Sequence, residues 1–358
     1  MYIMALIHKL CETHNLSEDE LIYLIDNISS EDKEYLFKKA SEVRDHYYGN
    51  KVFLRGLIEF TNYCKNDCYY CGIRCSNKNI DRYRLSLDDI LECCKIGYKL
   101  GFKTFVLQGG EDPFFTDDRL INIIRLIKEN YNDCAITLSL GERSYDSYKK
   151  LFDAGADRYL LRHETACEKH YSKLHPENLN LYDRKKCLST LKEIGFQVGA
   201  GFMVESPFQT TKNLAKDLIY LKELDPHMVG IGPFIPHHDT PFKNEKAGSL
   251  DKTLLMLAIT RLLLPKVLLP ATTALGTISN VGRELGLKAG ANVIMPNLSP
   301  KKLREKYSLY DNKVGTGDEA AESKRLIKEK INNAGFILDD SRGDNISWER
   351  SGTILNTL

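Results

Sequence analysis

Residues 60–74 read Phe-Thr-Asn-Tyr-Cys64-Lys-Asn-Asp-Cys68-Tyr-Tyr-Cys71-Gly-Ile-Arg74, with three cysteines at a C-x3-C-x2-C spacing. This stretch directly follows an alternating apolar run at 52–60, which predicts a strand. Three thiolates from one short loop can hold three corners of an iron-sulfur cube, because thiolate is the ligand that such clusters use. The fourth iron would then stay open, so the loop predicts a metal cluster that can bind a further molecule.

The composition indicates a chain that acts on a small-molecule partner. Its 358 residues include 50 basic and 49 acidic side chains, and no block of like charge suggests a nucleic-acid or membrane surface. The ten cysteines are scattered apart from the first cluster, and no secretory leader is seen, which predicts a reducing cytoplasm and a metal role for the clustered set. The opening apolar run is interrupted by His8 and Lys9, and no later run is long enough to span a membrane.

An alternation of strand and helix patterns predicts the fold class. The first fifty residues look helical, with a capping-box signature at Ser17 and Glu20. Eight short apolar runs then alternate with amphipathic segments, at 52–60, 104–108, 135–140, 158–162, 197–204, 228–234, 267–271 and 292–295. We therefore expect an α/β fold, a (β/α)8 TIM-type barrel at 51–300, with an N-terminal helical extension at 1–50 and a C-terminal cap and loose tail at 301–358.

Polar residues follow the first three of these runs. Chemistry in such barrels lies at the carboxyl ends of the strands, where the cysteine loop is expected. The second run ends in Gln108-Gly-Gly-Glu111, whose glycines allow close backbone approach and whose carboxylate could hold an ammonium group. An isolated Gly-Gly would be only a tight turn. Thr137 and Ser139 lie on one face of the third run, and could bind a ribose or merely satisfy the strand end.

The fourth run leads into the most polar strand end, residues 158–165. A purely structural role would require counter-charges for Arg158 and Arg162, so we favour an anionic substrate for Arg158 and a sugar hydroxyl for Glu164. Arg184 opens the next helix and suits a carboxylate, unless it only pairs with Asp183.

Three further candidates lie on or after later apolar runs. Met203 could pack beside a ligand, but taken alone it is more typical of a core. The run 237–239, His-His-Asp, has metal-ligand types, yet adjacent residues rarely share one ion and prolines frame the turn. Thr272 and Thr273 offer hydroxyl donors for an anion or a cyanide-like acceptor.

The Cys-Tyr-Tyr-Cys-Gly end of the loop resembles the radical SAM superfamily. Within it, the chain resembles the HydE-type FeFe-hydrogenase maturases, in the group that also holds biotin synthase and methylornithine synthase. The similar stretches are 77–84, 106–113, 137–142, 155–166, 228–236, 271–277 and 290–297. Together they cover roughly the whole barrel.

The resemblance implies a 4Fe-4S cluster on the catalytic Cys64, Cys68 and Cys71, and S-adenosylmethionine at its open iron. An anaerobic reaction would form a 5'-deoxyadenosyl radical that attacks a cysteine-bound iron carbonyl-cyanide complex, a precursor of the hydrogenase diiron centre. The implied S-adenosylmethionine residues are Tyr70, Gln108, Gly109, Gly110, Glu111, Thr137, Ser139, Glu164, Arg184 and Met203. The implied substrate residues are Arg55, Arg158, Arg162, His163, Thr272, Thr273 and Tyr307. Implied protein partners are a ferredoxin or flavodoxin as electron donor, and other hydrogenase maturases.

Departures from the family pattern keep alternatives open. No cysteine follows Cys187, so no second cluster is expected in the tail, and residues 204–208 replace a glycine-containing turn. Cys75 adds a fourth thiol, which could close the cluster and make the protein an electron carrier. A zinc-stabilised binding module is a third alternative. A methylornithine synthase-like or biotin synthase-like enzyme, acting on a small amino-acid-type substrate, is the nearest functional competitor.

Overall fold

A ring of parallel strands forms the centre of the computed structural model, which describes residues 2–317 and 319–350. Six strands are hydrogen-bonded in the order β2-β3-β4-β5-β6-β8. Their bounds are β2 Gly56–Thr61, β3 Thr104–Gly109, β4 Ala135–Ser139, β5 Arg158–Leu160, β6 Gln197–Ala200 and β8 Met228–Val229.

Residues 268–270 and β10 (Val293–Ile294) close this sheet into a barrel. Met228 bridges Leu268 and Pro270 bridges Val293, both in parallel. β10 then pairs with β1 (Lys51–Leu54), the segment that precedes β2. All eight apolar runs therefore lie in one parallel ring, which confirms the expected TIM-type barrel.

The first run differs from the single strand that was expected at 52–60. It is broken at Arg55 into β1 and β2. The break arises where the chain changes neighbours, because β1 pairs with β10 and with β11 (Ile337–Asp339), whereas β2 pairs with β3.

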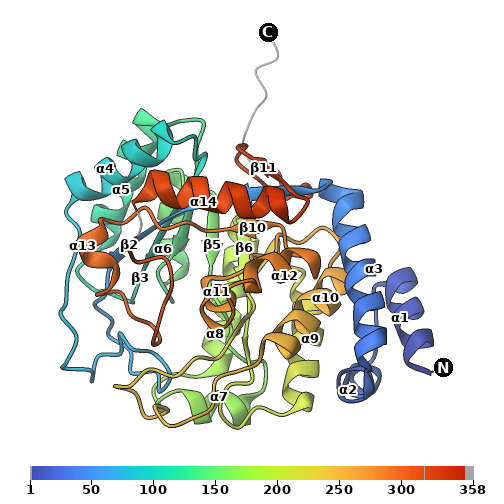
Figure 1. Ribbon diagram of the computed structural model, residues 1–358. Coiled ribbons are helices and arrows are strands. Elements are labelled where there is room, and N and C mark those ends of the chain that lie inside the picture. Colours follow the sequence, from blue (N-terminus) through green and yellow to red (C-terminus); the bar gives the residue numbers. More distant parts are fainter. Residues whose placement is uncertain (1, 318, 351–358) are drawn as a thin grey trace.

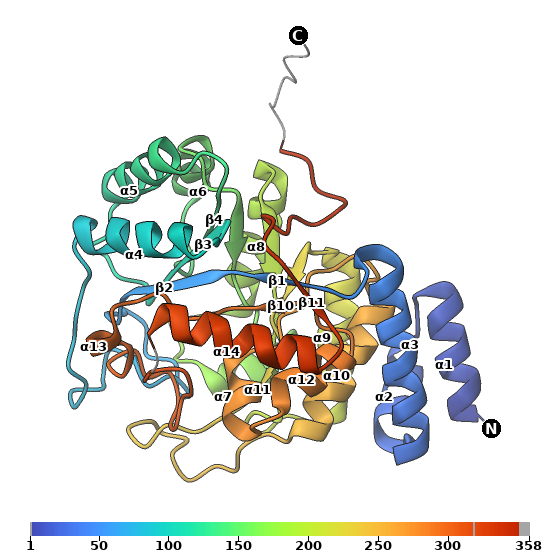
Figure 2. The ribbon, with the colours of Figure 1, turned by 45° about the horizontal axis from the view of Figure 1, so that its top comes forward.

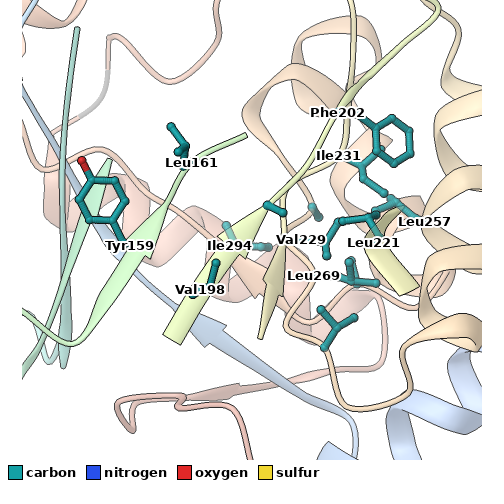
Figure 3. Close-up of a cluster of buried hydrophobic side chains, with 14 of the residues drawn as sticks. Tyr159, Leu161, Val198, Phe202, Leu221, Val229, Ile231, Leu257, Leu269 and Ile294 are labelled. Atoms are coloured by element: carbon teal, nitrogen blue, oxygen red, sulfur yellow. The ribbon is translucent and has the colours of Figure 1, made fainter. Parts of the chain in front are cut away.

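Helices lie around the outside of the strands (Figure 1). They are α4 Leu87–Lys99, α5 Asp117–Asn130, α6 Tyr145–Asp153, α7 Glu168–Leu174, α8 Leu181–Ile194, α9 Thr211–Leu224, α10 Leu250–Leu263, α11 Thr273–Ile278, α12 Gly282–Lys288, α13 Lys301–Arg304 and α14 Ala320–Asn333. Outward-facing strand residues fill the space beneath them: Val198 and Val229 belong to one buried apolar cluster with Leu221 of α9 and Leu257 of α10 (Figure 3). Burial of this apolar layer is the main force that holds helices to the sheet.

Three N-terminal helices extend the barrel on one side. They are α1 (Tyr2–Thr13), α2 (Glu18–Asn27) and α3 (Ser30–Tyr48), and the capping box of Ser17 with Glu20 is present. α2 packs against α9 and α3 against α10. None of the helices in the described part of the chain has the length and apolar character that a membrane crossing needs.

The C-terminal segment covers the amino-terminal end of the barrel. β11 pairs with β1, and Figure 2 shows α14 crossing the front of the barrel near β11. Asn345 donates to the carbonyl oxygens of His227 and Lys266, and Trp348 donates to that of Gly195. The expectation of a loose tail is therefore wrong as far as residue 350, and residues 351–358 lie outside the described residues.

Candidate active site

The cysteine loop follows β2 at the carboxyl end of the barrel, opposite β11 (Figure 1). Its own polar side chains fix its shape. Arg82 donates to the carbonyl oxygens of Ile73 and Arg74 at 2.9 and 2.7 Å, and the Arg74 Nε donates to Asp67 at 2.6 Å. The loop therefore presents its thiols from a preformed backbone.

The three thiols of this loop are costly to ionise without a metal. Burial raises the pKa of Cys64 and of Cys68, and raises that of Cys71 to about 12. A metal replaces the protons and removes this cost. Three thiols from one short loop match the ligand set of an iron-sulfur cluster.

The glycine pair after β3 packs directly against the cysteine loop. A Cβ atom on Gly110 would lie 2.3 Å from the Tyr63 carbonyl oxygen and 2.6 Å from the Cys64 Cβ. The backbone N–H of Lys65 donates to the Glu111 carbonyl oxygen at 2.9 Å. Close approach therefore requires glycine here, and it brings Glu111 beside the cysteines.

Arg184 and two carboxylates form a charged group beside the loop. The Arg184 Nε lies 2.6 Å from the Glu142 Oε1, and the Glu111 Oε1 accepts a hydrogen bond from the Glu142 backbone at 3.0 Å. Burial opposes the charge of Arg184, but Tyr171 and Glu142 outweigh burial and hold its pKa well above the usual value. The partner of Arg184 is thus Glu142 rather than Asp183, and the site-residue predictions had not included Glu142, although it follows a strand end as Glu111 does.

The segment after β5 divides its side chains between two faces. Glu164 has φ +64°, and its Oε2 lies 3.0 Å from Arg162. His163 instead faces α9, where its Nε2 lies 3.5 Å from the Asp217 Oδ1, and both side chains are fully buried. Asp217 also accepts a hydrogen bond from the Ala166 backbone. The position of His163 therefore does not support the expected substrate contact; it supports a role in holding the segment.

Arg158 lies at the amino end of β5, away from the cysteine loop. Its Nη2 lies 2.6 Å from the Asp344 Oδ1, and its Nη1 donates to Thr104 at 2.9 Å. The counter-charge that a structural role requires is therefore present, in the C-terminal segment. This position corrects the expectation of a substrate contact at a strand end.

Several buried polar atoms inside the barrel have no protein partner among the described residues. They include the Nε and Nη2 of Arg55 and the Oγ1 of Thr137. Burial lowers the pKa of Arg55 well below its usual value, and nearby Arg158 lowers it further. Unpaired buried donors are rare, so these atoms indicate an interior that accommodates a polar ligand or water.

A segment at 308–314 crosses the carboxyl end of the barrel. Leu309 accepts a hydrogen bond from Gly72 at 2.9 Å, and Val314 donates to Thr277 at 3.4 Å. Lys313 pairs with the buried Glu59 of β2. Next to this segment, the Tyr307 hydroxyl accepts from Gln108 at 3.3 Å. The segment therefore covers the site where Gln108 and Tyr307 meet.

The remaining strand-end candidates have local partners as well. Thr272 caps α11 by accepting from the Leu275 backbone at 3.4 Å, and Thr273 accepts from Arg283 at 3.3 Å. Ser139 ends β4, and Met203 begins β7 (Met203–Val204), which pairs with β9 (Gly232–Pro233). Met203 packs with the tyrosines of the cysteine loop, so both interpretations of it remain compatible with its position.

Two loops that raised questions in the sequence have structural explanations. The rings of His237 and His238 stack at 4.3 Å, and the Nδ1 of His238 lies 2.6 Å from Asp311. One ligand atom from each of His237, His238 and Asp239 also lies within 4.8 Å of the others, so the contacts fit the favoured structural role without testing it against a metal site. In the turn after β7, Glu205 and Phe208 have φ of +56° and +65°, so non-glycine residues adopt a backbone shape that glycine favours.

Comparison with known proteins agrees with this site. Residues 58–253 match the family model described as the Radical SAM superfamily. The chain belongs to the radical SAM superfamily. It is 51% identical over 281 residues to the [FeFe] hydrogenase maturase subunit HydE of Thermotoga maritima, covering 78% of this chain and 80% of that protein. It is 34% identical to 3-methylornithine synthase of Methanosarcina acetivorans, covering 89% and 90%.

The solved structure of methylornithine synthase (PylB) superimposes with a TM-score of 0.83 at 30% identity, covering 93% of this chain and 97% of that chain. As a radical SAM enzyme, this protein uses a 4Fe-4S cluster and S-adenosylmethionine. The described residues fit both groups, because three buried thiols lie beside a carboxylate–arginine group at one end of a polar interior. Cluster chemistry and the barrel fold predicted from the sequence are therefore confirmed.

Proposed function

We propose that this radical SAM enzyme is a HydE-type maturase that acts on a cysteine-bound iron carbonyl-cyanide complex during assembly of the FeFe-hydrogenase diiron centre. The observation that carries the proposal is the 51% identity to the Thermotoga maritima maturase, against 34% to 3-methylornithine synthase, over most of the chain. The site geometry agrees with either reaction at its radical-forming end.

In this proposal Cys64, Cys68 and Cys71 hold the cluster. A cluster bound there would supply one electron, and that electron would cleave S-adenosylmethionine into methionine and a 5'-deoxyadenosyl radical. The rigid loop and its packing against Gly110 fix where the thiols stand. The three cysteines are half-buried, and burial raises the pKa of their thiols until a metal replaces the protons.

The charged group beside the loop suits the amino-acid part of S-adenosylmethionine. Glu111 and Glu142 would attract its ammonium group, and the Arg184 guanidinium would bind its carboxylate. Glu164, whose left-handed backbone is held by the segment around it, would bind the ribose. The other residues proposed to line this ligand are Tyr70, Gln108, Gly109, Gly110, Thr137, Ser139 and Met203.

The interior of the barrel suits an anionic substrate. Arg162, Thr272, Thr273 and Tyr307 lie towards the carboxyl end, and Arg55 contributes unpaired donors from deeper in the barrel. Arg158 and His163 would support the barrel wall around this interior, through their pairs with Asp344 and Asp217. The segment at 308–314 would exclude water. A ferredoxin or flavodoxin would deliver the electron, and other maturases would supply the substrate or receive the product.

The test starts with anaerobic reconstitution of the cluster. Either the cysteine-bound iron carbonyl-cyanide complex or free lysine is then added, each in a separate experiment, to reduced enzyme with S-adenosylmethionine. We expect the iron complex to be consumed together with formation of 5'-deoxyadenosine. Consumption of lysine instead would establish the methylornithine synthase-like alternative and refute the proposal.

A further inference from the structure

The interior of the barrel is covered at both ends, so entry of a ligand as large as S-adenosylmethionine requires that one cover moves. The cover at the amino end includes regular structure, because β11 pairs with β1 over three residues. The cover at the carboxyl end is the segment 308–314, which contains no helix or strand. A segment outside any ladder can open locally at lower cost, so the carboxyl end is the end that we expect to open.

One side chain of this segment reaches into the barrel. The Lys313 Nζ forms an ion pair with the Oε1 of Glu59, and it also donates to the Tyr307 carbonyl oxygen at 3.0 Å. The Lys313 side chain is 10% exposed and that of Glu59 is 1% exposed. The other carboxylate oxygen of Glu59 accepts from the Asn297 Nδ2 at 2.8 Å. Lys313 therefore supplies the positive charge at this carboxylate, and Asn297 supplies a neutral donor.

Opening of the segment would separate this ion pair. Glu59 belongs to β2, where it is in register with Gln108 of β3, so it stays in the barrel wall while Lys313 moves away. Removal of one partner from a buried ion pair is strongly unfavourable, because the remaining charge has lost its counter-charge. The pair of Lys313 with Glu59 therefore favours the closed position of the segment.

The two flanks of the segment differ in how tightly they are packed. On the N-terminal side, Ser308 lies directly on the cysteine loop, because a Cβ atom on Gly72 would be 2.2 Å from its carbonyl oxygen. On the C-terminal side, a Cβ atom on Gly315 or on Gly317 would meet no atom within 4 Å, and Gly315 has φ +81°. Unpacked glycines can absorb a change in backbone angles, so this flank is suited to be a hinge.

The other side-chain contact of the segment is a weak one. The Asp311 Oδ1 lies 2.6 Å from the Nδ1 of His238, but the His238 side chain is 68% exposed and that of Asp311 is 32% exposed. Exposed ion pairs contribute little to stability, because water screens them. The buried pair of Lys313 with Glu59 is therefore the main side-chain contact that holds the segment closed.

We propose that the segment 308–314 is a lid, which opens about Gly315 and Gly317 to admit ligands to the barrel and is kept closed by the ion pair of Lys313 with Glu59. The lid rests on Gly72, next to Cys71, so it covers the place where S-adenosylmethionine binds. The inference goes beyond the proposed reaction, because the iron complex and an amino-acid substrate would pass the same lid.

The test measures association and dissociation rates of labelled S-adenosylmethionine by rapid filtration, with reconstituted enzyme whose cluster is oxidised, so that no cleavage occurs. A lid limits passage in both directions, so Lys313→Met and Glu59→Gln should each raise both rates about tenfold and change the Kd by less than about twofold. The double variant should match the single variants, because all three remove the same ion pair.

Lys306→Met is the matched control. Lys306 precedes the lid and pairs with Asp81, whose side chain is 71% exposed, so neither rate should change. Unchanged rates in Lys313→Met, a rise in its dissociation rate alone, or an equal rise in Lys306→Met would overturn the proposal. A rise in dissociation alone would mean that Lys313 acts as a ligand contact.

Amide hydrogen exchange covers the case in which a variant takes up less cluster. In the closed lid the backbone N–H of Asp311 donates to the Pro236 carbonyl oxygen at 3.1 Å, and that of Val314 donates to Thr277 at 3.4 Å. In Lys313→Met these amides should exchange about tenfold faster than in wild type at equal cluster content, while the amides of β11 keep their wild-type rates. Unchanged exchange in the lid, or an equal acceleration in β11, would refute the inference.

Discussion

Replacement of Asp344 by asparagine should destabilise the barrel from its amino-terminal end. The Asp344 Oδ1 lies 2.6 Å from the fully buried Arg158 and accepts from Gln197 at 2.6 Å, while its Oδ2 accepts from Arg342 at 2.9 Å. Asp344→Asn keeps the shape but removes the negative charge. It leaves Arg158 beside Arg55, and it also removes the carboxylate that favours the charge of Arg55.

The expected cost follows from the burial of this pair. Breaking a fully buried ion pair costs about 3–5 kcal/mol. The Asp344 side chain is 30% exposed, so we expect a smaller loss, about 2–3 kcal/mol. The entropy of unfolding grows with chain length, and for a chain of this size the loss corresponds to a fall in Tm of about 3–4 °C.

The assay is urea and thermal unfolding of the variant beside Asp340→Asn. Asp340 lies four residues earlier and pairs with Lys324 at 3.0 Å, but its side chain is 59% exposed, so that change should cost less than about 1 kcal/mol. Burial raises the pKa of Asp344, but Arg158 and Arg342 outweigh burial and hold it below the usual value. The pair therefore stabilises the fold above the unfolded pKa, and the difference between wild type and Asp344→Asn should shrink as the pH falls below about 4.

Two results would refute this reasoning. One is a loss of stability in Asp344→Asn no larger than in Asp340→Asn. The other is loss of S-adenosylmethionine cleavage at temperatures where Asp344→Asn is folded, since the cysteine loop lies at the opposite end of the barrel.

Three further predictions concern the carboxyl end. Gly110→Ala should lower iron and sulfide content, because the new methyl would lie 2.3 Å from the Tyr63 carbonyl oxygen, whereas Gly317→Ala, with no atom within 4 Å, should not. Glu142→Gln should raise the KM for S-adenosylmethionine roughly tenfold by weakening the hold on Arg184; an equal rise in the control Asp183→Asn would contradict this. Cys75→Ser should retain the EPR signal and cleavage activity, and loss of the cluster would instead favour a closed cluster on four thiols.

The parts of the molecule that follow from local sequence were predictable. The eight strand runs, the capping box at Ser17 and the glycine pair before Glu111 each depend on residues close together in the chain. The direction of the His163 side chain could also have been predicted, because alternation along an extended chain places it on the side opposite to Arg162. That signal was outweighed by the grouping of polar residues in one short segment.

Contacts between distant segments left no local signal. Asp344 lies 186 residues after Arg158, in a tail whose composition suggested a mobile end. The Nε2 of His175 lies 3.1 Å from the Tyr70 hydroxyl oxygen, yet the two residues are 105 positions apart in the chain. In the sequence, a polar residue next to a proline, such as His175, is typical of an ordinary helix end. These pairs form only when the barrel closes. The sequence therefore indicates which polar residues are important, but it does not indicate which residues they contact.

Buried charges are compensated in different ways at the two ends of the barrel. At the amino end, Arg158 receives a matching carboxylate from the chain itself, which is what a structural closure requires. Inside the barrel, Arg55 and Thr137 keep buried polar atoms for which the described residues supply no partner. At the carboxyl end, buried thiols become stable anions only when a metal binds. Because Thr137 is in register with Arg158 and Arg55 lies near Arg158, the unpaired groups line the closed end of the interior, and a polar substrate that satisfies them would lie between that end and the cysteine loop.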